Sequence, residues 1–336
     1  MRAVVLKKYG SPSDLTIEER ECPEPGADEV LVEVVSAGVN DWDWSLVRGK
    51  PFYIRLLCGL RKPKVEIPGI EIAGRVTKIG DGVDAFSVGD RVYGDLSAHG
   101  FGGFAEFVAV KHTSLRTIPE VFSFDEASAI PHAAMLALQG LKDIGRLEPG
   151  QTVLINGAGG GVGVIGVQLA KRLGASRVVG VDHTRKLSLM QEIGFDRVID
   201  YTKHDFTCDE ERFDLILDAK TSRKASVHLR ALKPGGCYVT IGGDTDKLLR
   251  VLLFSFVSKR LTGKRVKVLG LVPNRGLEEF ADMFLGERLQ LVIDRSFSLA
   301  QMAKAIQHFG SASHLGKVVV HIQGECENQN NSEQTT

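Results

Sequence analysis

A glycine-rich stretch, residues 157–163, has the residue types and spacing that most directly suggest chemistry. Five of its seven residues are glycine, and it lies between an apolar run at 153–155 and apolar residues that recur at helical spacing toward Lys171. Such a turn leaves backbone N–H groups uncovered at a helix N-terminus, where the helix dipole stabilises a pyrophosphate. Taken alone, the cluster also fits a tight strand-to-helix turn that binds nothing.

The surroundings of this stretch favour a bound dinucleotide. Ala158, Gly160 and Gly163 fall where the three small residues of a dinucleotide fingerprint belong, with alanine in the first place. Asp182 ends the next apolar run, at the distance of roughly 20 residues where a carboxylate binds a ribose hydroxyl. The alternative role for Asp182 is a helix N-cap. The predicted pyrophosphate contacts are Ala158, Gly160, Gly161, Val162 and Gly163, with a helix beginning near Val162.

The composition is that of a two-domain protein without a strong charge bias. A chain of 336 residues is longer than one ordinary core, and its 42 basic and 42 acidic residues argue against nucleic-acid or membrane-surface partners. Its five cysteines form no C-x-x-C pair, and the first residues lack an apolar stretch of signal-peptide length, so we expect a cytoplasmic location. The apolar stretch 248–257 is too short to span a bilayer, and we expect a buried helix or an interface.

The order of the predicted elements gives the fold class. Residues 1 to about 120 contain short strands closed by Gly, Pro or Asp, which favours a barrel-like first domain. After Pro119, buried strands alternate with helices, as in a parallel doubly wound sheet. A helix at 297–309 and a strand at 316–322 are expected to rejoin the first domain, and 325–336 is expected to be a disordered tail.

Several separate motifs, in order along the chain, resemble the medium-chain dehydrogenase/reductase superfamily and its zinc-independent quinone oxidoreductase branch. The motifs are Pro68-Gly-Ile-Glu-Ile-Ala-Gly74, Val88-Gly-Asp-Arg-Val92, Gly103-Phe-Ala-Glu-Phe-Val-Ala-Val110, Gly160-Gly-Val-Gly163, Val198-Ile-Asp-Tyr201, Leu232-Lys-Pro-Gly-Gly236 and Gly316-Lys-Val-Val-Val320. The resemblance runs to about residue 322. It implies a GroES-like β-barrel-type catalytic domain (1–122 and 291–324) and a Rossmann NAD(P)-binding domain (123–290), with the cofactor cleft between them. It also implies a homodimer, formed by pairing of the strand near Val266 across a two-fold axis.

The same resemblance bears on metal binding. Zinc enzymes of this superfamily use a Cys where this chain has Asn40 and a His where it has Ile70, and they carry a four-cysteine lobe that is missing here. We therefore predict no zinc. A weaker alternative is an oxygen and nitrogen site formed by Asp41, Asp43, Glu71, His99 and His132.

The resemblance also suggests roles for individual side chains. Lys186 and Tyr201 match positions that bind the 2′-phosphate in NADPH-dependent quinone reductases, whereas Asp182 would bind the 2′-OH of NAD(H), so NADP(H) is favoured only slightly. Asn40 matches a residue beside the nicotinamide and is a candidate for hydrogen bonding to cofactor or substrate; a strand-end turn is its other role. Tyr53 is the candidate proton donor, with packing in a hydrophobic wall as the alternative.

Together these features predict a reductase that uses NAD(P)H. Without a metal to polarise a plain carbonyl, hydride transfer to a quinone or an α,β-unsaturated carbonyl is favoured, because hydrogen bonds can stabilise the resulting enolate. The alternatives are an alcohol dehydrogenase for small alcohols and ketones, and a dinucleotide-binding sensor without turnover. The expected partner is a small-molecule substrate.

Overall fold

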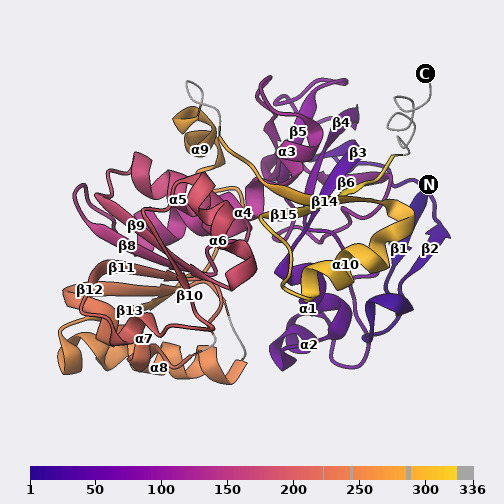
Figure 1. The fold of residues 1–336 in the computed structure, drawn as a ribbon. Coiled ribbons are helices and arrows are strands. Elements are labelled where there is room, and N and C mark those ends of the chain that lie inside the picture. Colours follow the sequence, from indigo (N-terminus) through magenta and orange to yellow (C-terminus); the bar gives the residue numbers. More distant parts are fainter. Residues whose placement is uncertain (222, 243–244, 285–288, 324–336) are drawn as a thin grey trace, which may run out of the picture.

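The computed structural model describes residues 1–221, 223–242, 245–284 and 289–323, which form two bodies, each built around its own sheet (Figure 1). The predicted tail, 325–336, lies outside the described residues. One body is mainly antiparallel and the other has a parallel sheet covered by helices.

The first body contains a seven-stranded sheet, in the order β14-β15-β3-β4-β5-β7 with β6 paired to β3, and the two-stranded sheet β1-β2. Its strands are β1 (Arg2–Val5), β2 (Thr16–Glu19), β3 (Glu29–Val39), β4 (Glu71–Ile79), β5 (Arg91–Asp95), β6 (Phe107–Lys111), β7 (Arg116–Thr117), β14 (Ile293–Ser298) and β15 (Lys317–His321). Strand β15 is antiparallel to β3, with Val318 opposite Val39. As expected, residues 317–321 therefore rejoin the first body.

The second body has six strands in the order β10-β9-β8-β11-β12-β13, and every pairing is parallel. The strands are β8 (Thr152–Asn156), β9 (Arg177–Asp182), β10 (Arg197–Asp200), β11 (Phe213–Asp218), β12 (Leu232–Thr240) and β13 (Arg265–Val268). The chain winds in one direction from β8 to β10 and in the other from β11 to β13. This order confirms the predicted doubly wound sheet, and its switch point is where such folds bind ligands.

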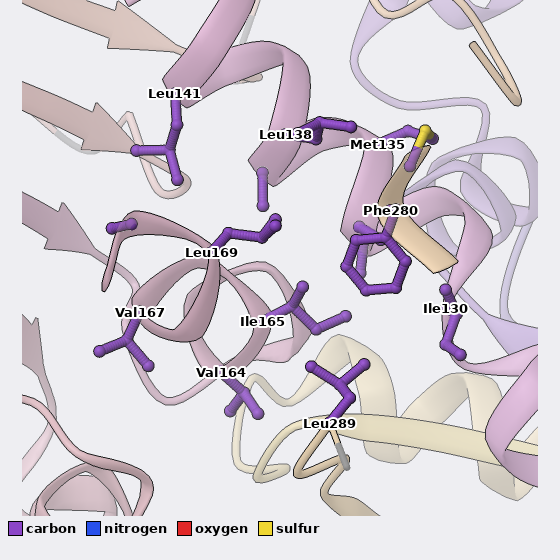
Figure 2. Close-up of a cluster of buried hydrophobic side chains, with 14 of the residues drawn as sticks. Ile130, Met135, Leu138, Leu141, Val164, Ile165, Val167, Leu169, Phe280 and Leu289 are labelled. Carbon is purple, nitrogen blue, oxygen red and sulfur yellow. The ribbon is translucent and has the colours of Figure 1, made fainter. Parts of the chain in front are cut away.

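Helices cover both faces of the parallel sheet, with α4, α5 and α6 above it and α7 and α8 below it in Figure 1. The helices of the chain are α1 (Asp41–Arg48), α2 (Phe52–Cys58), α3 (Phe124–Ser128), α4 (Pro131–Leu138), α5 (Gly161–Arg172), α6 (Leu187–Ile193), α7 (Ala225–His228), α8 (Thr245–Thr262), α9 (Leu277–Met283) and α10 (Met302–Gly310). A buried apolar cluster that includes Leu138, Ile165 and Phe280 joins α4, α5 and α9 (Figure 2). This core fixes α5, which carries the glycine stretch, against the sheet.

The apolar stretch 248–257 was predicted to be a buried helix or an interface, and it is not a buried helix. It forms part of α8, but only Val251 is buried in the way predicted, and Leu253 and Phe256 are exposed to 62% and 79%. Ser258 faces inward, where its Oγ accepts a hydrogen bond from the backbone N–H of Val266. The exposure leaves the other predicted role, an interface, because apolar composition does not say which side of a helix the sheet can cover. Among the described residues, no helix is both long and apolar enough to cross a membrane.

Candidate active site

The glycine stretch turns sharply between β8 and α5. Gly157 has φ of 86°, in the left-handed region that glycine tolerates. Helix α5 begins at Gly161, one residue before the predicted start, and its first helical hydrogen bond runs from the N–H of Val164 to the carbonyl oxygen of Gly160 over 3.0 Å. The amides of residues 161–163 precede that bond and are therefore free to bind an anion at the helix N-terminus.

Close packing explains why small residues occupy this turn. A Cβ added to Gly163 would lie 2.2 Å from the carbonyl oxygen of Ala158, which is wholly buried. A Cβ on Gly161 would lie 2.7 Å from the Lys317 side chain. At Gly160, by contrast, a Cβ would meet only the carbonyl oxygen of Gly157, at 3.6 Å. Other residues thus pack closely against Gly161 and Gly163, whereas the space beside Gly160 is open, which fits a phosphate-bearing group.

Beyond the loop, the carboxylate predicted to bind a ribose hydroxyl, that of Asp182, already accepts hydrogen bonds within the protein. The Asp182 carboxylate is 4% exposed and accepts hydrogen bonds from the backbone N–H of Gly159, at 2.9 Å, and of His183, at 2.8 Å. Lys186 Nζ lies 3.8 Å from an Asp182 oxygen. Tyr201 is half exposed and stands edge-on to the ring of His183.

Lys186 is an unusual lysine because its side chain is 1% exposed and its Nζ has no hydrogen-bond partner among the described residues. Burial lowers the pKa of its ammonium, although the Asp182 charge opposes this, and Lys220 lowers the pKa further. Burial, with the charges of Lys186 and Lys220, also lowers the pKa of nearby His314 to about 3. An anionic ligand would therefore stabilise the Lys186 ammonium, because it would supply the hydrogen-bond acceptor that Nζ lacks among the described residues.

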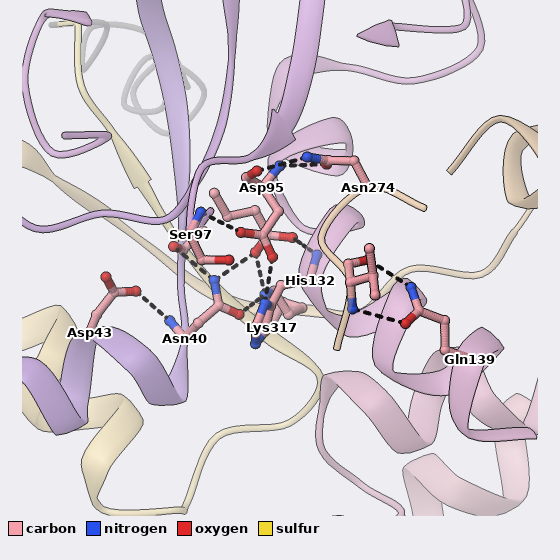
Figure 3. A network of polar contacts seen from close by, with 11 residues as sticks. Asn40, Asp43, Asp95, Ser97, His132, Gln139, Asn274 and Lys317 are labelled. Carbon is pink, nitrogen blue, oxygen red and sulfur yellow. Dashed lines mark hydrogen bonds and ion pairs between the residues drawn. The ribbon is translucent and has the colours of Figure 1, made fainter. Parts of the chain in front are cut away.

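Where the two bodies meet, Asn40 and Lys317 (Figure 3) form a buried polar cluster with Glu71. Lys317 Nζ donates to Asn40 Oδ1 and to Glu71 Oε2, each at 2.6 Å, and Asn40 Nδ2 donates to the same glutamate oxygen at 2.8 Å. Asn40 caps α1 at the end of β3, Glu71 begins β4 and Lys317 begins β15. Adjacent strands of one sheet thus hold the three side chains together.

The cluster continues toward α4. The backbone N–H of His132 donates to Glu71 Oε1 at 2.8 Å, and the His132 ring Nδ1 lies 2.7 Å from Asp95 Oδ2. Although burial alone would raise the pKa of Asp95, the charge of His132 lowers it, and Asp95 raises the pKa of His132 despite burial. Asn274 binds the backbone of Asp95 through two hydrogen bonds of 2.8 Å, which links the second body to the network.

Asp43 supports Asn40 from the other side. Its carboxylate accepts from the backbone N–H of Asn40 at 2.9 Å and of Gly69 at 3.1 Å (Figure 3). Burial raises the pKa of Asp43 to about 7 in spite of these bonds. Tyr53, the candidate proton donor, is half-buried on α2 and packs against the core of the first body.

The chain has relatives with similar sequence along most of its length. A family model described as an alcohol dehydrogenase GroES-like domain matches residues 26–120, and one described as a zinc-binding dehydrogenase matches 193–320. A 2-methylene-furan-3-one reductase of Solanum lycopersicum is 31% identical over 96% of this chain and 79% of its own. A chloroplastic quinone-oxidoreductase, QR1, of Triphysaria versicolor is 31% identical over 95% of this chain and 98% of its own.

The chain belongs to the quinone oxidoreductase-like branch of the medium-chain dehydrogenase/reductase superfamily. A solved quinone oxidoreductase from Coxiella burnetii has the same fold, with a TM-score of 0.85, 26% identity and coverage of 96% of this chain and 99% of its own. The predicted resemblance and the α/β fold class, a GroES-like domain with a Rossmann domain, are therefore confirmed.

In the described part of this medium-chain dehydrogenase/reductase, a donor set for zinc is not assembled. No group of three or more His, Cys, Asp or Glu side chains among the described residues could hold a metal ion, although one matching model is described as zinc-binding. Ile70, whose side chain cannot bind a metal, is fully buried. Of the weaker oxygen and nitrogen candidates, Asp43 and Glu71 accept hydrogen bonds from Asn40, and His132 is paired with Asp95. The residues present do not fit a zinc site.

Sequence reasoning missed most of this buried cluster. The sequence pointed to Lys317 only as part of a motif, to Glu71 only as part of a motif and as a weak metal candidate, to His132 only as a weak metal candidate, and to Asp95 not at all. One signal could have found Glu71 and Lys317, because each places a charge directly before a short buried run, residues 72–74 and 318–320. Charges of opposite sign at the heads of buried strands suggest a buried pair.

Proposed function

We propose that this protein is a zinc-independent, NAD(P)H-dependent reductase that transfers hydride to a quinone or an α,β-unsaturated carbonyl. One observation carries the proposal: the open glycine turn lies directly beside a buried Lys317–Glu71–Asn40 cluster that has no set of metal-ligating side chains. The named activities of the tomato and Triphysaria relatives support this substrate class.

The reduced nicotinamide dinucleotide, when bound, supplies the hydride. In the proposed site, the amides of Gly161, Val162 and Gly163 hold its pyrophosphate, and the cation of Lys317, whose side chain packs against Gly161, adds attraction. Asn40 is the proposed contact beside the nicotinamide, fixed by Lys317 and Glu71 so that its amide cannot rotate.

Negative charge on the substrate oxygen grows as hydride adds to an enone or quinone. A buried ammonium stabilises such charge more than an exposed one does, because water does not screen it. Lys317 Nζ has three N–H groups, and the described contacts use two of them. Tyr53 is retained as the proposed proton donor to the reduced substrate.

For the cofactor we propose a slight preference for NADPH. The Asp182 carboxylate, which would repel a 2′-phosphate, is held by two backbone amides, whereas Lys186 Nζ lacks a hydrogen-bond partner among the described residues. Tyr201, the second proposed phosphate contact, is half exposed beside the ring of His183. K186A should raise the KM for NADPH about 10-fold and leave the KM for NADH unchanged. An equal effect on both KM values would contradict this assignment.

The remaining parts of the proposal concern the whole molecule. We propose domains at 1–122 with 291–324 and at 123–290, which the pairing of β15 with β3 supports. We also propose a homodimer formed through β13, because this strand is an edge of the parallel sheet. A cytoplasmic location accords with the four described cysteines, all of which are free thiols.

The decisive experiment measures oxidation of NADPH and of NADH in the presence of a quinone, an enone and a simple ketone. We expect turnover with the quinone or enone and little with the ketone. Turnover of ketones or alcohols alone, increased by added zinc, would replace this proposal with an alcohol dehydrogenase. Dinucleotide binding without any turnover would favour a sensor.

A further inference from the structure

We infer that one face of this protein docks on an anionic lipid surface. The face is formed by α2 with the loop after it and by α8, and we call it the α2–α8 face. Its exposed large apolar side chains are Phe52, Leu56, Leu57, Leu60, Leu249, Leu252, Leu253, Phe256, Val257 and Leu261. They are 10 of the 16 exposed large hydrophobic side chains described.

Both helices expose this apolar surface because each has only a narrow buried side. In α2, Ile54 and Cys58 point into the first domain, so Phe52, Leu56 and Leu57 remain outside. In α8, Val251 and Ser258 face the sheet, seven residues apart, which leaves the opposite side to solvent. Contiguous exposed apolar surface of this kind marks an interaction site.

The two helices can meet one flat surface. In Figure 1 both lie along the lower edge of the molecule, α2 below the first domain and α8 below the parallel sheet, and nothing is drawn beneath them. A plane below the molecule would therefore touch both helices together.

The charge of these segments selects the partner. Residues 47–65 contain six Lys and Arg and no acidic residue, and residues 248–277 contain seven and no acidic residue, although the whole chain is neutral. Lys50, Arg61, Lys62 and Lys64 are exposed, as are Arg250, Lys259 and Arg260. None of these seven forms an ion pair in the part of the chain that is described, whereas many lysines elsewhere do.

An apolar strip flanked by unpaired cations matches the surface of an anionic membrane, where apolar side chains enter the interface and cations bind the headgroups. A second copy of the chain matches it poorly. A two-fold interface would bring the same patch from both copies together, so the cations would face each other. The zero net charge of the whole chain argued against a membrane-surface partner. It is an average over the chain, however, and does not show that cations are concentrated in these two segments.

Vesicle co-sedimentation tests the inference with the full-length protein. We expect binding to vesicles of equal parts phosphatidylcholine and phosphatidylserine, little binding to phosphatidylcholine alone, and loss of binding at high salt. The triple variant R250Q/K259Q/R260Q should bind the anionic vesicles on the order of 100-fold more weakly, since each cation near the surface contributes about fivefold. L253S/F256S should weaken binding as well.

The matched control is K78Q/K111Q/K142Q, which removes the same charge from exposed lysines that are paired with Glu24, Asp28 and Glu279. It should bind as the unmodified protein does. Equal binding by the two triple variants would overturn the inference. Conversion of a dimer to a monomer by L253S/F256S, with no vesicle binding by the unmodified protein, would also overturn it and make the face a subunit interface. Dinucleotide binding by every variant, measured in parallel, shows that the fold is intact and does not depend on the proposed reaction.

Discussion

Removal of Lys317 should destabilise the protein strongly, because it would leave Glu71 charged and without its partner. Glu71 is fully buried and the Lys317 side chain is 5% exposed, with Nζ 2.6 Å from the carboxylate. Taking one member from a buried pair costs about 3–5 kcal/mol, since the remaining charge keeps its desolvation penalty. We therefore expect K317M to lower the free energy of unfolding by about that amount, and E71Q to lower it as well, by leaving the ammonium buried.

The double variant separates the attraction between the two charges from the packing of the two side chains. If the two charges stabilise each other, E71Q/K317M should be more stable than the sum of the single effects predicts, by about 2 kcal/mol. Urea unfolding followed by tryptophan fluorescence measures this, because both tryptophans, Trp42 and Trp44, lie in α1 directly after Asn40.

The exposed pair Lys78–Glu24, with Nζ and Oε1 2.7 Å apart, provides the control. The corresponding variants K78M and E24Q should each cost less than about 1 kcal/mol, and their effects should add. A coupling below about 0.5 kcal/mol for Lys317 and Glu71 would refute the reasoning, because the two charges would then not depend on each other.

Three further predictions concern the loop and the neighbouring side chains. Burial raises the pKa of Asp43 to about 7, so the folded protein favours the protonated carboxyl. The resulting stabilisation is complete below about pH 4 and is lost as the pH rises to 7. In urea titrations, the free energy of unfolding of the unmodified protein relative to that of D43N should therefore fall by at most about 4 kcal/mol over that range. G163A should cost about 1–3 kcal/mol and abolish dinucleotide binding, because its Cβ would overlap the Ala158 carbonyl, whereas G160A should weaken binding alone; equal stability of the two variants would count against the packing argument. Y53F should lower kcat about 100-fold with KM unchanged if Tyr53 is the proton donor, and an unchanged kcat would place the donor elsewhere.

The parts of the molecule that depend on local sequence could be predicted well. The six parallel strands and the turn before α5 follow from short apolar runs, helical spacing and glycine, all of which act over a few residues. The start of α5 differed from the prediction by only one residue, because glycines at 160 and 161 leave the boundary poorly marked.

Long-range contacts could not be predicted in this way. Lys317 is 277 residues from Asn40 and 246 from Glu71 in sequence, and only the pairing of β15 with β3 and of β3 with β4 brings them together. The choice between a buried helix and an interface for residues 248–257 was left open for a related reason, since which side of α8 is covered depends on its packing against β13 and not on the helix itself.

These contacts make the site dependent on β15, the last strand among the described residues. The N–H of Gly316 donates to the carbonyl oxygen of Gly159 in the glycine turn at 2.9 Å, and the next residue is Lys317, which closes the cluster with Asn40 and Glu71. One short segment thus contacts both the turn proposed to hold the pyrophosphate and the side chains proposed to surround the nicotinamide. The two halves of the site are therefore fixed relative to each other by β15, and a shift of this strand would disturb both together.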